Sequence, residues 1–315
     1  RGHPYTIIDK KIEAFYKIYE HACVLSGIAI GSQDKDFDDA LELAARGVPL
    51  LCVDVANGHN THVANFVSRL KAKLSDTHIM AGNVATASGF ELLAKSGADS
   101  IRVGISGGAA CSTASNTGCG MPTLQSVLDC AEWREKSDYT YVTIIADGGC
   151  KSSGDFAKAI AAGADFVMAG SLFAGTSASP GKMMWMNKTT QQISDKRPLR
   201  KVSMNDIYGR VVGDVDVEVN DETAIRVKKY EGMASFNVQS EQGRDTSKIV
   251  PEGESTYVKY SGETSEMIRL LLGGLRSAMS YSNAATLEQF RLNAEFVEVS
   301  HAGLIESRPH AIYRL

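Results

Sequence analysis

The chain of 315 residues has no long apolar stretch, no excess of basic charge and no closely spaced cysteine pair. No apolar run approaches the roughly 18–20 residues of a membrane-spanning helix, so we expect no membrane segment. The formal net charge of −4 argues against nucleic acid as a partner, because such proteins present a basic surface. The six cysteines are scattered without a C-x-x-C motif, which is typical of a reduced, cytoplasmic protein.

Two common nucleotide-binding motifs are also missing. G-x-G-x-x-G is absent, and the glycine-rich segment SGGAACSTASNTGCG (106–120) has no G-K-[ST], which excludes a Rossmann fingerprint and a P-loop. Cys111 and Cys119 are separated by seven residues without a nearby histidine and make a poor metal pair. Two interpretations stay open: Cys111 is a nucleophile whose thiolate is stabilised by backbone N–H groups, or it is a small buried cysteine in a tight turn.

The sequence does contain a repeated pattern of a helix end, a glycine and an apolar run. The glycine supplies the left-handed cap that ends a helix. The apolar runs are continuous and do not alternate with polar residues, which predicts strands buried on both faces, as in a parallel sheet. We predict six β-α units across residues 24–180: one strand lies in 24–31, and the others run into the segments 54–58, 81–86, 103–108, 146–150 and 169–171. Since six units do not close an eight-stranded barrel, an open doubly wound sheet and a barrel with two further strands both stay open.

Small and polar residues follow each of these runs, as in DVANG, AGNVAT, VGISGG, ADGGC and AGS. Since the carboxyl ends of parallel strands meet at one edge of a sheet, we expect the functional site there.

The rest of the chain has a different character. Residues 182–228 are interpreted as an insertion; within it the alternating stretch 211–230, with an Asn-Asp pair, predicts a β-hairpin. Residues 234–250 are polar and lack periodicity, which predicts a mobile flap. Helices are expected at about 263–281 and 285–293. A C-terminal tail follows from about 295, and we expect residues 301–315 to be extended.

Seven segments, in this order, resemble the family of IMP dehydrogenases and GMP reductases: DVANGH, HIMAGNVAT, ADSIRVGISGGAACSTASNTGCGMP, IIADGGCKSSGDFAKAIAAGADFVMAGSLFAGT, KKYEGMAS, VPEGES and LLLGGLRSAMSY. They cover most of residues 10–310. The resemblance implies an α/β TIM barrel forming a single catalytic domain over 1–315, with its first two strands expected before Arg1. The regulatory CBS module of many dehydrogenases is not seen in this sequence.

The resemblance also implies a covalent mechanism on a purine nucleotide. Cys111 matches the cysteine that attacks C2 of the base, and Thr113 matches the threonine that positions water or ammonia. Arg244 matches a flap arginine that activates water. The implied ligands are a purine nucleoside monophosphate (IMP, XMP or GMP) and NAD or NADP.

Further residues match the family's binding positions. Those implied for the nucleotide are Asp147, Gly149, Gly170, Ser171, Tyr230, Gly232, Met233 and Glu252. Those implied for the nicotinamide cofactor are Asp54, Asn83 and Arg102. A monovalent cation, K⁺, is implied at Ser106, Gly108 and Cys111, with Glu306 and Ser307 from a neighbouring subunit of a homotetramer.

The chain departs from the family pattern at several positions. The loop G-P-G-S-x-C reads S-G-G-A-A-C, so Ala109 stands where a serine contacts phosphate, and Ala114 stands where an arginine is usual. Asp245 replaces the tyrosine that follows the flap arginine of the dehydrogenase, and Phe236 replaces the glutamate of the reductase.

Three functional hypotheses follow. Arg244 and the tail HAGLIES favour an IMP dehydrogenase, which converts IMP, NAD and water to XMP and NADH. The motifs DVANG and DGGC favour a GMP reductase, which converts GMP and NADPH to IMP and ammonia. The departures at Ala109, Phe236 and Asp245 favour a nucleotide-binding paralogue with little activity.

Overall fold

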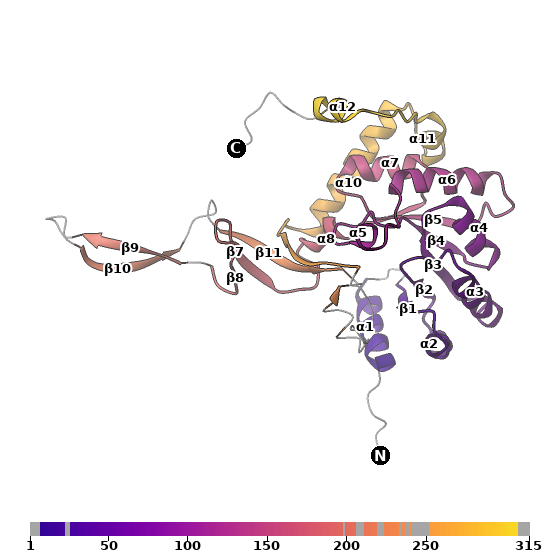
Figure 1. Cartoon of the computed structure of the whole chain (residues 1–315), viewed down its shortest axis with the longest axis horizontal. Helices are drawn as coiled ribbons and strands as arrows, with labels where there is room; N and C mark the ends of the chain where they lie inside the picture. The colour runs from indigo at the N-terminus through magenta and orange to yellow at the C-terminus, as the bar shows by residue number, and fades with distance from the viewer. Residues whose placement is uncertain are drawn as a thin grey trace, which may run out of the picture.

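A parallel sheet at one end of the molecule carries most of the fold (Figure 1). The computed structural model describes residues 7–22, 26–197, 199–205, 211–218, 224–232, 235–236, 240 and 252–307. The six strands are β1 (Ile28–Ile30), β2 (Leu50–Asp54), β3 (His78–Val84), β4 (Ser100–Val103), β5 (Thr143–Asp147) and β6 (Phe166–Met168). They lie in chain order, each parallel to the next.

Helices connect successive strands, as the predicted β-α units require. They are α2 (Asp34–Ala45), α3 (Thr61–Lys73), α4 (Ala87–Lys95), α5 (Thr113–Thr117), α6 (Thr123–Glu135) and α7 (Ser153–Ala161), with α1 (Ile7–Ala22) before β1 and α8 (Ser171–Ala174) after β6. Parallel strands in sequential order, each joined by a helix, make up the wall of a (β/α) barrel. The six predicted strands and the TIM-barrel fold class are therefore confirmed.

Local sequence sets where these helices begin and end. The side chains of Asn60, Thr86 and Ser152 accept hydrogen bonds from the first-turn N–H groups of α3, α4 and α7. Gly47 and Gly97, just beyond α2 and α4, have φ of 86° and 93°. This left-handed conformation is the role predicted for the repeated glycines, because it costs other residues steric strain.

The core lies between the sheet and its helices. Leu51, Ile79, Ile101 and Ile144, from four adjacent central strands, are fully buried. The edge strand β6 differs, since Phe166 is 64% exposed. The apolar runs of the central strands are thus buried as predicted.

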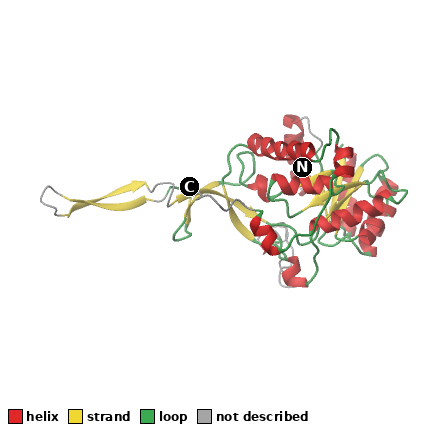
Figure 2. Cartoon of the chain, turned by 90° about the horizontal axis from the view of Figure 1, so that it is seen from above, coloured by secondary structure: helices red, strands yellow, loops and turns green. Residues whose placement is uncertain are grey.

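A second sheet and a projecting arm follow α8. The sheet has the strand order β12–β11–β7–β8, with bounds β7 (Met183–Asn187), β8 (Ile193–Ser194), β11 (Ala224–Glu231) and β12 (Ser255–Lys259). The arm pairs β9 (Leu199–Asn205) with β10 (Val211–Glu218) and extends away from the helices in both views (Figures 1 and 2).

The predicted hairpin over 211–230 is wrong in its pairing. Both segments are strands, but β10 pairs with β9, while β11 pairs with β7 and β12. Ala224 and Val227 of β11 are buried in the body of the molecule, and this burial outweighs the local turn signal.

At the C-terminus, α10 (Thr264–Tyr281) and α11 (Leu287–Asn293) confirm the two predicted helices. The expectation of an extended tail is wrong for α12 (His301–Glu306), whose first turn is capped by the Ser300 side chain. The predicted flap, 234–250, lies outside the described residues except for 235–236 and 240. Among the described helices, none is long and apolar enough to cross a membrane.

A buried arginine joins the outer helix layer to the sheet. Arg134 of α6 donates to the carbonyls of Val142 and Gly163 and pairs with Asp165. It is 8% exposed. We expect Arg134→Leu to lower the free energy of unfolding by about 2 kcal/mol, because two carbonyls lose a buried donor, while Asp165 keeps its ion pair with Arg291.

Chemical denaturation checks this expectation. Lys136→Leu on the same helix is the control, since Lys136 only forms an exposed ion pair with Glu132 and should leave stability almost unchanged. Equal effects of the two substitutions would contradict the assignment.

Candidate active site

The loop after β4 is held in place by a segment far away in the sequence. Cys111 forms a β-bridge with Gly253. The Ser112 N–H donates to the Glu252 carbonyl (2.9 Å), and the Glu254 N–H donates to the Ala110 carbonyl (2.8 Å). Gly232 extends the same arrangement by donating to the Glu254 carbonyl (2.9 Å). The residues expected around the purine base therefore meet at the cysteine loop.

A short chain of hydrogen bonds runs from the cysteine side chain. The Cys111 thiol donates to Thr113 Oγ1 (3.2 Å), and this hydroxyl donates to Glu252 Oε2 (2.8 Å). Cys111 is partly exposed, whereas Thr113 is buried. The thiol is thus accessible while its two partners are fixed, which is the arrangement a nucleophile and its positioning groups require.

Polar side chains from neighbouring strands form one network at the carboxyl edge of the sheet. Arg102 of β4 pairs with Asp54 of β2 (Nη1–Oδ1, 2.8 Å) and with Asp147 of β5 (Nη2–Oδ2, 3.2 Å). Asn83 of β3 donates to the same Asp147 oxygen (2.8 Å) and to the Gly104 carbonyl (2.7 Å). Residues implied for the cofactor and for the nucleotide therefore share one network.

Neighbouring carboxylates keep the Arg102 guanidinium in its charged form. Burial disfavours its charged form, but the carboxylates of Asp54 and Asp147 outweigh this and raise the pKa of the Arg102 guanidinium. The guanidinium also donates to the Cys52 thiol (3.3 Å), and burial raises the pKa of that thiol. Cys52 is therefore a neutral contact of this network and not a second nucleophile.

One buried atom in this network lacks a partner. Asn83 Oδ1 accepts no hydrogen bond from the described residues, although its amide nitrogen donates twice. A buried acceptor without a donor costs free energy. Asn83 thus fits a ligand that carries an N–H₂ group, such as the carboxamide of a nicotinamide.

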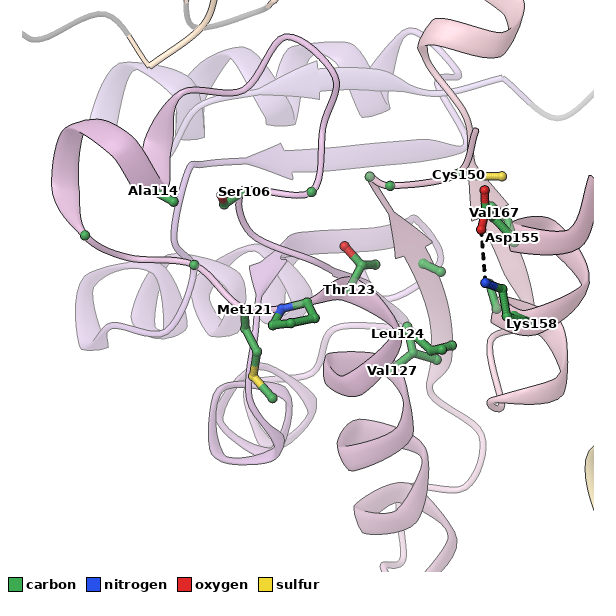
Figure 3. A pocket seen from close by; sticks show the side chains of 18 residues that line it. Ser106, Ala114, Met121, Thr123, Leu124, Val127, Cys150, Asp155, Lys158 and Val167 are labelled. Atoms are coloured by element: carbon green, nitrogen blue, oxygen red, sulfur yellow. Dashed lines mark ion pairs between the residues drawn. The ribbon is translucent and has the colours of Figure 1, made fainter. Parts of the chain in front are cut away.

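Two glycines allow the cysteine loop to approach β5. Gly148 has a φ of 91°, and a Cβ at this position would lie 2.8 Å from the carbonyl carbon of Gly107. Gly149 has a φ of 81°. A groove of about 530 Å³ lies beyond this contact, between the loop, α6 and α7. Ser106, Thr123 and Cys150 are among the residues that line it (Figure 3). The glycines bring Asp147 and the cysteine loop together.

The expected phosphate cradle lies at the start of α8. Gly170 precedes this helix and Ser171 begins it. Tyr230 faces them from β11, because a Cβ on Gly170 would lie 2.8 Å from the Tyr230 hydroxyl. Burial, and secondarily the charge of Asp147, raise the pKa of the Tyr230 phenol. Gly170 and Tyr230 both line a cavity of about 450 Å³.

Four of the implied site residues cannot be counted among those that the structure brings together here. Met233 and Arg244 lie outside the described residues. Glu306 ends α12 and Ser307 caps it, and Figure 1 shows α12 well apart from α5, which follows Cys111. Of the implied cation ligands, the Gly108 carbonyl accepts the Cys111 N–H (3.1 Å), and Ser106 has a φ of 73°.

Sequence reasoning missed two residues at this site, Cys52 and Lys228. Lys228 is 4% exposed and donates to backbone carbonyls beside the cradle. The pair Lys228-Lys229 was the available signal, because consecutive residues of a strand point to opposite faces and one lysine must point inward.

Comparison with known proteins supports the same assignment. The family model "IMP dehydrogenase / GMP reductase domain" matches residues 11–196 and 214–310. The chain belongs to this family. Members of the family are oxidoreductases that act on IMP or GMP. The residues between the two matched segments, 197–213, include β9 and the first strand positions of β10.

Individual relatives match over most of the chain. The inosine-5′-monophosphate dehydrogenases of Chlorobaculum tepidum and Escherichia coli K12 are each 36% identical, over 91% of this chain and 52% of their own length. A crystal structure of a Trypanosoma brucei GMP reductase variant in complex with guanosine 5′-monophosphate has a TM-score of 0.73 and 34% identity. It is matched over 92% of this chain and 53% of its own. The chain thus spans about half the length of these relatives.

The backbone at Ser106 supplies a testable prediction. A left-handed φ of 73° is strained for a residue with a Cβ. We expect Ser106→Gly to raise the free energy of unfolding by about 1 kcal/mol, measured by denaturant unfolding. Ser112→Gly, where φ is −111°, is the control and should lower stability. A loss of stability in Ser106→Gly would show that its conformation is not strained.

Proposed function

We propose that this chain is the catalytic part of a purine-nucleotide oxidoreductase of the IMP dehydrogenase type, converting IMP, NAD and water to XMP and NADH. The hydrogen-bonded chain Cys111–Thr113–Glu252 carries the proposal, because it presents a thiol beside the Asp147–Gly149 turn. The curated relatives named above are IMP dehydrogenases, and the flap arginine Arg244 supports the same direction.

The chemistry assigned to the chain's own residues is nucleophilic catalysis. The Cys111 sulfur forms a bond to C2 of the purine, which makes C2 tetrahedral and able to release a hydride. NAD, when bound, accepts that hydride. Thr113 then orients a water toward C2, and bond formation to its oxygen displaces the Cys111 sulfur. Arg244 is assigned to removing the proton from this water.

Binding roles follow from position. Asp147 holds the ribose hydroxyls, while Gly149, Gly170, Ser171 and Tyr230 surround the phosphate. Gly232 and Glu252, which meet at the cysteine loop, are assigned to the base, and Met233 is assigned there from the sequence match alone. Asn83, with its unused buried acceptor, faces the nicotinamide together with Asp54 and Arg102.

A homotetramer binding K⁺ completes the proposal. The carbonyls of Ser106, Gly108 and Cys111 are the assigned ligands from one subunit. Because α12 lies apart from the cysteine loop in the same chain, Glu306 and Ser307 would have to come from a neighbour (Figure 1). Activity that requires potassium and tracks the tetramer would support this part.

GMP reductase is the second candidate. The solved structure of a GMP reductase with guanosine 5′-monophosphate aligns with nearly the whole chain, and the motifs DVANG and DGGC favour the same reaction. In that reaction Cys111 would form a bond to C2 and displace ammonia, and a hydride supplied by NADPH to C2 would then allow the Cys111 sulfur to leave, giving IMP.

One spectrophotometric assay separates the candidates. With IMP and NAD in potassium buffer we expect NADH to form, and Cys111→Ala should lower the rate by at least about 10³-fold, since loss of a covalent nucleophile costs this much or more. Cys119→Ala, which changes an exposed thiol of the same loop, is the matched control and should keep its activity.

The other outcomes are equally informative. Consumption of NADPH with GMP and release of ammonia would replace the dehydrogenase by the reductase. Nucleotide binding without turnover, equal in wild type and Cys111→Ala, would identify a binding paralogue and overturn both reactions.

A further inference from the structure

Lys228 is a buried lysine with an unusual set of partners. It lies on β11, is 4% exposed and donates to three backbone carbonyls, those of Thr176 (2.9 Å), Ser177 (3.3 Å) and Ser179 (2.5 Å). All three belong to the turn that follows α8. Since an ammonium group has three hydrogens, its donors are fully used by this one turn.

The charge of Lys228 is not balanced by an ion pair. Among the described residues no carboxylate lies within ion-pair distance of its Nζ. Glu263 is nearby but accepts from the Ser177 hydroxyl (2.7 Å). Carbonyl dipoles satisfy the N–H groups of a buried cation without neutralising it, so an anion bound close by would be favoured.

The next residue shows the contrast. Lys229 points to the other face of β11, has a side chain that is 45% exposed and pairs with Glu231 (2.9 Å). Its charge is thus paired and exposed to solvent, although the residue also lines the cavity that contains Gly170 and Tyr230. The two residues thus offer the same side chain in two environments only one position apart.

The turn held by Lys228 belongs to the expected phosphate cradle. The cavity of about 450 Å³ that is lined by Gly170 and Tyr230 is also lined by Thr176 and Ser179. Helix α8 has four residues, so its two ends are only about 6 Å apart. Lys228 holds the carboxyl end of α8, and Gly170 and Ser171 form its amino end. Tyr230, two positions along β11, is on the same face as Lys228.

We propose that Lys228 determines the affinity for the phosphate group of the bound nucleoside 5′-monophosphate. It is a positioning residue that does not touch the nucleotide: it fixes the turn and thereby α8, and its positive charge is balanced by the phosphate dianion across this short helix. This inference rests on the proposed nucleotide site, but it does not depend on which of the two reactions the chain performs.

Protection of Cys111 from alkylation by iodoacetamide tests the inference. IMP and its nucleoside inosine are compared in wild type, Lys228→Met and the control Lys136→Met, by the ligand concentration that halves the labelling rate of Cys111. In Lys228→Met we expect the advantage of IMP over inosine to fall at least tenfold, while inosine protects within twofold of wild type. Lys136→Met should keep the full advantage, because Lys136 is an exposed, ion-paired lysine of α6 that does not line this cavity. Lys228→Arg should keep it as well, since it keeps the charge.

Each of the other possible results contradicts the inference about Lys228 or the proposed nucleotide site on which it rests. If Lys228→Met weakens IMP and inosine equally, the residue is only structural and the inference is wrong. The same conclusion follows if Lys228→Arg loses the advantage as Lys228→Met does. If wild type itself does not prefer IMP, both the proposed nucleotide site and this inference fall.

A measurement on wild type covers the case in which Lys228→Met does not fold. Inorganic phosphate should slow amide hydrogen exchange both at residues 170–171 and in the 176–179 turn, because the ligand and Lys228 act on the two ends of one helix. Exchange that is unchanged in the turn while it slows at 170–171 would overturn the inference.

Discussion

The buried guanidinium of Arg102 is the interaction on which the arrangement of this site depends. It lies between the carboxylates of Asp54 and Asp147, from β2 and β5, and so joins strands on both sides of β4. Two partly buried carboxylates at the same sheet edge would repel each other without a cation between them. The residue proposed to bind the ribose, Asp147, and a residue proposed for the cofactor, Asp54, are therefore held by the same cation.

A second constraint acts on the nucleophile. The cysteine loop is rich in small residues with little side chain to pack, so its position comes from backbone pairing with residues 252–254 and from contact with Gly148. Gly232 is bound to the same strand segment. The two described ends of the flap region, at Gly232 and Glu252, are thus fixed beside Cys111.

Local sequence patterns predicted which segments form strands and helices better than they predicted which strands pair with each other. Continuous apolar runs and helix-ending glycines such as Gly47 and Gly97 identified all six parallel strands. A strand buried on both faces requires consecutive apolar residues, and a left-handed φ favours glycine, so both features can be read from the sequence. The pairing of β10 was missed because its expected partner, β11, belongs to another sheet. Val227 of β11 is buried there, and β10 pairs with β9 instead. The hydrogen bond from Thr113 to Glu252 spans 139 positions, and no spacing rule contains it; only the resemblance placed both at one site.

Phosphate recognition shows how the departures from the family pattern and the buried lysine fit together. Ala109, an exposed residue of the cysteine loop, has no hydroxyl to offer where the pattern has serine. At the proposed phosphate site, the glycine turn at Gly149 can offer only backbone groups, so side-chain contacts would come from the α8 side, through Ser171 and Tyr230. That side is where a buried cation holds the adjoining turn. Without a serine hydroxyl at position 109, phosphate binding would depend more on the charge of Lys228 beside α8. A charge at low dielectric acts over a longer range than a single hydrogen bond.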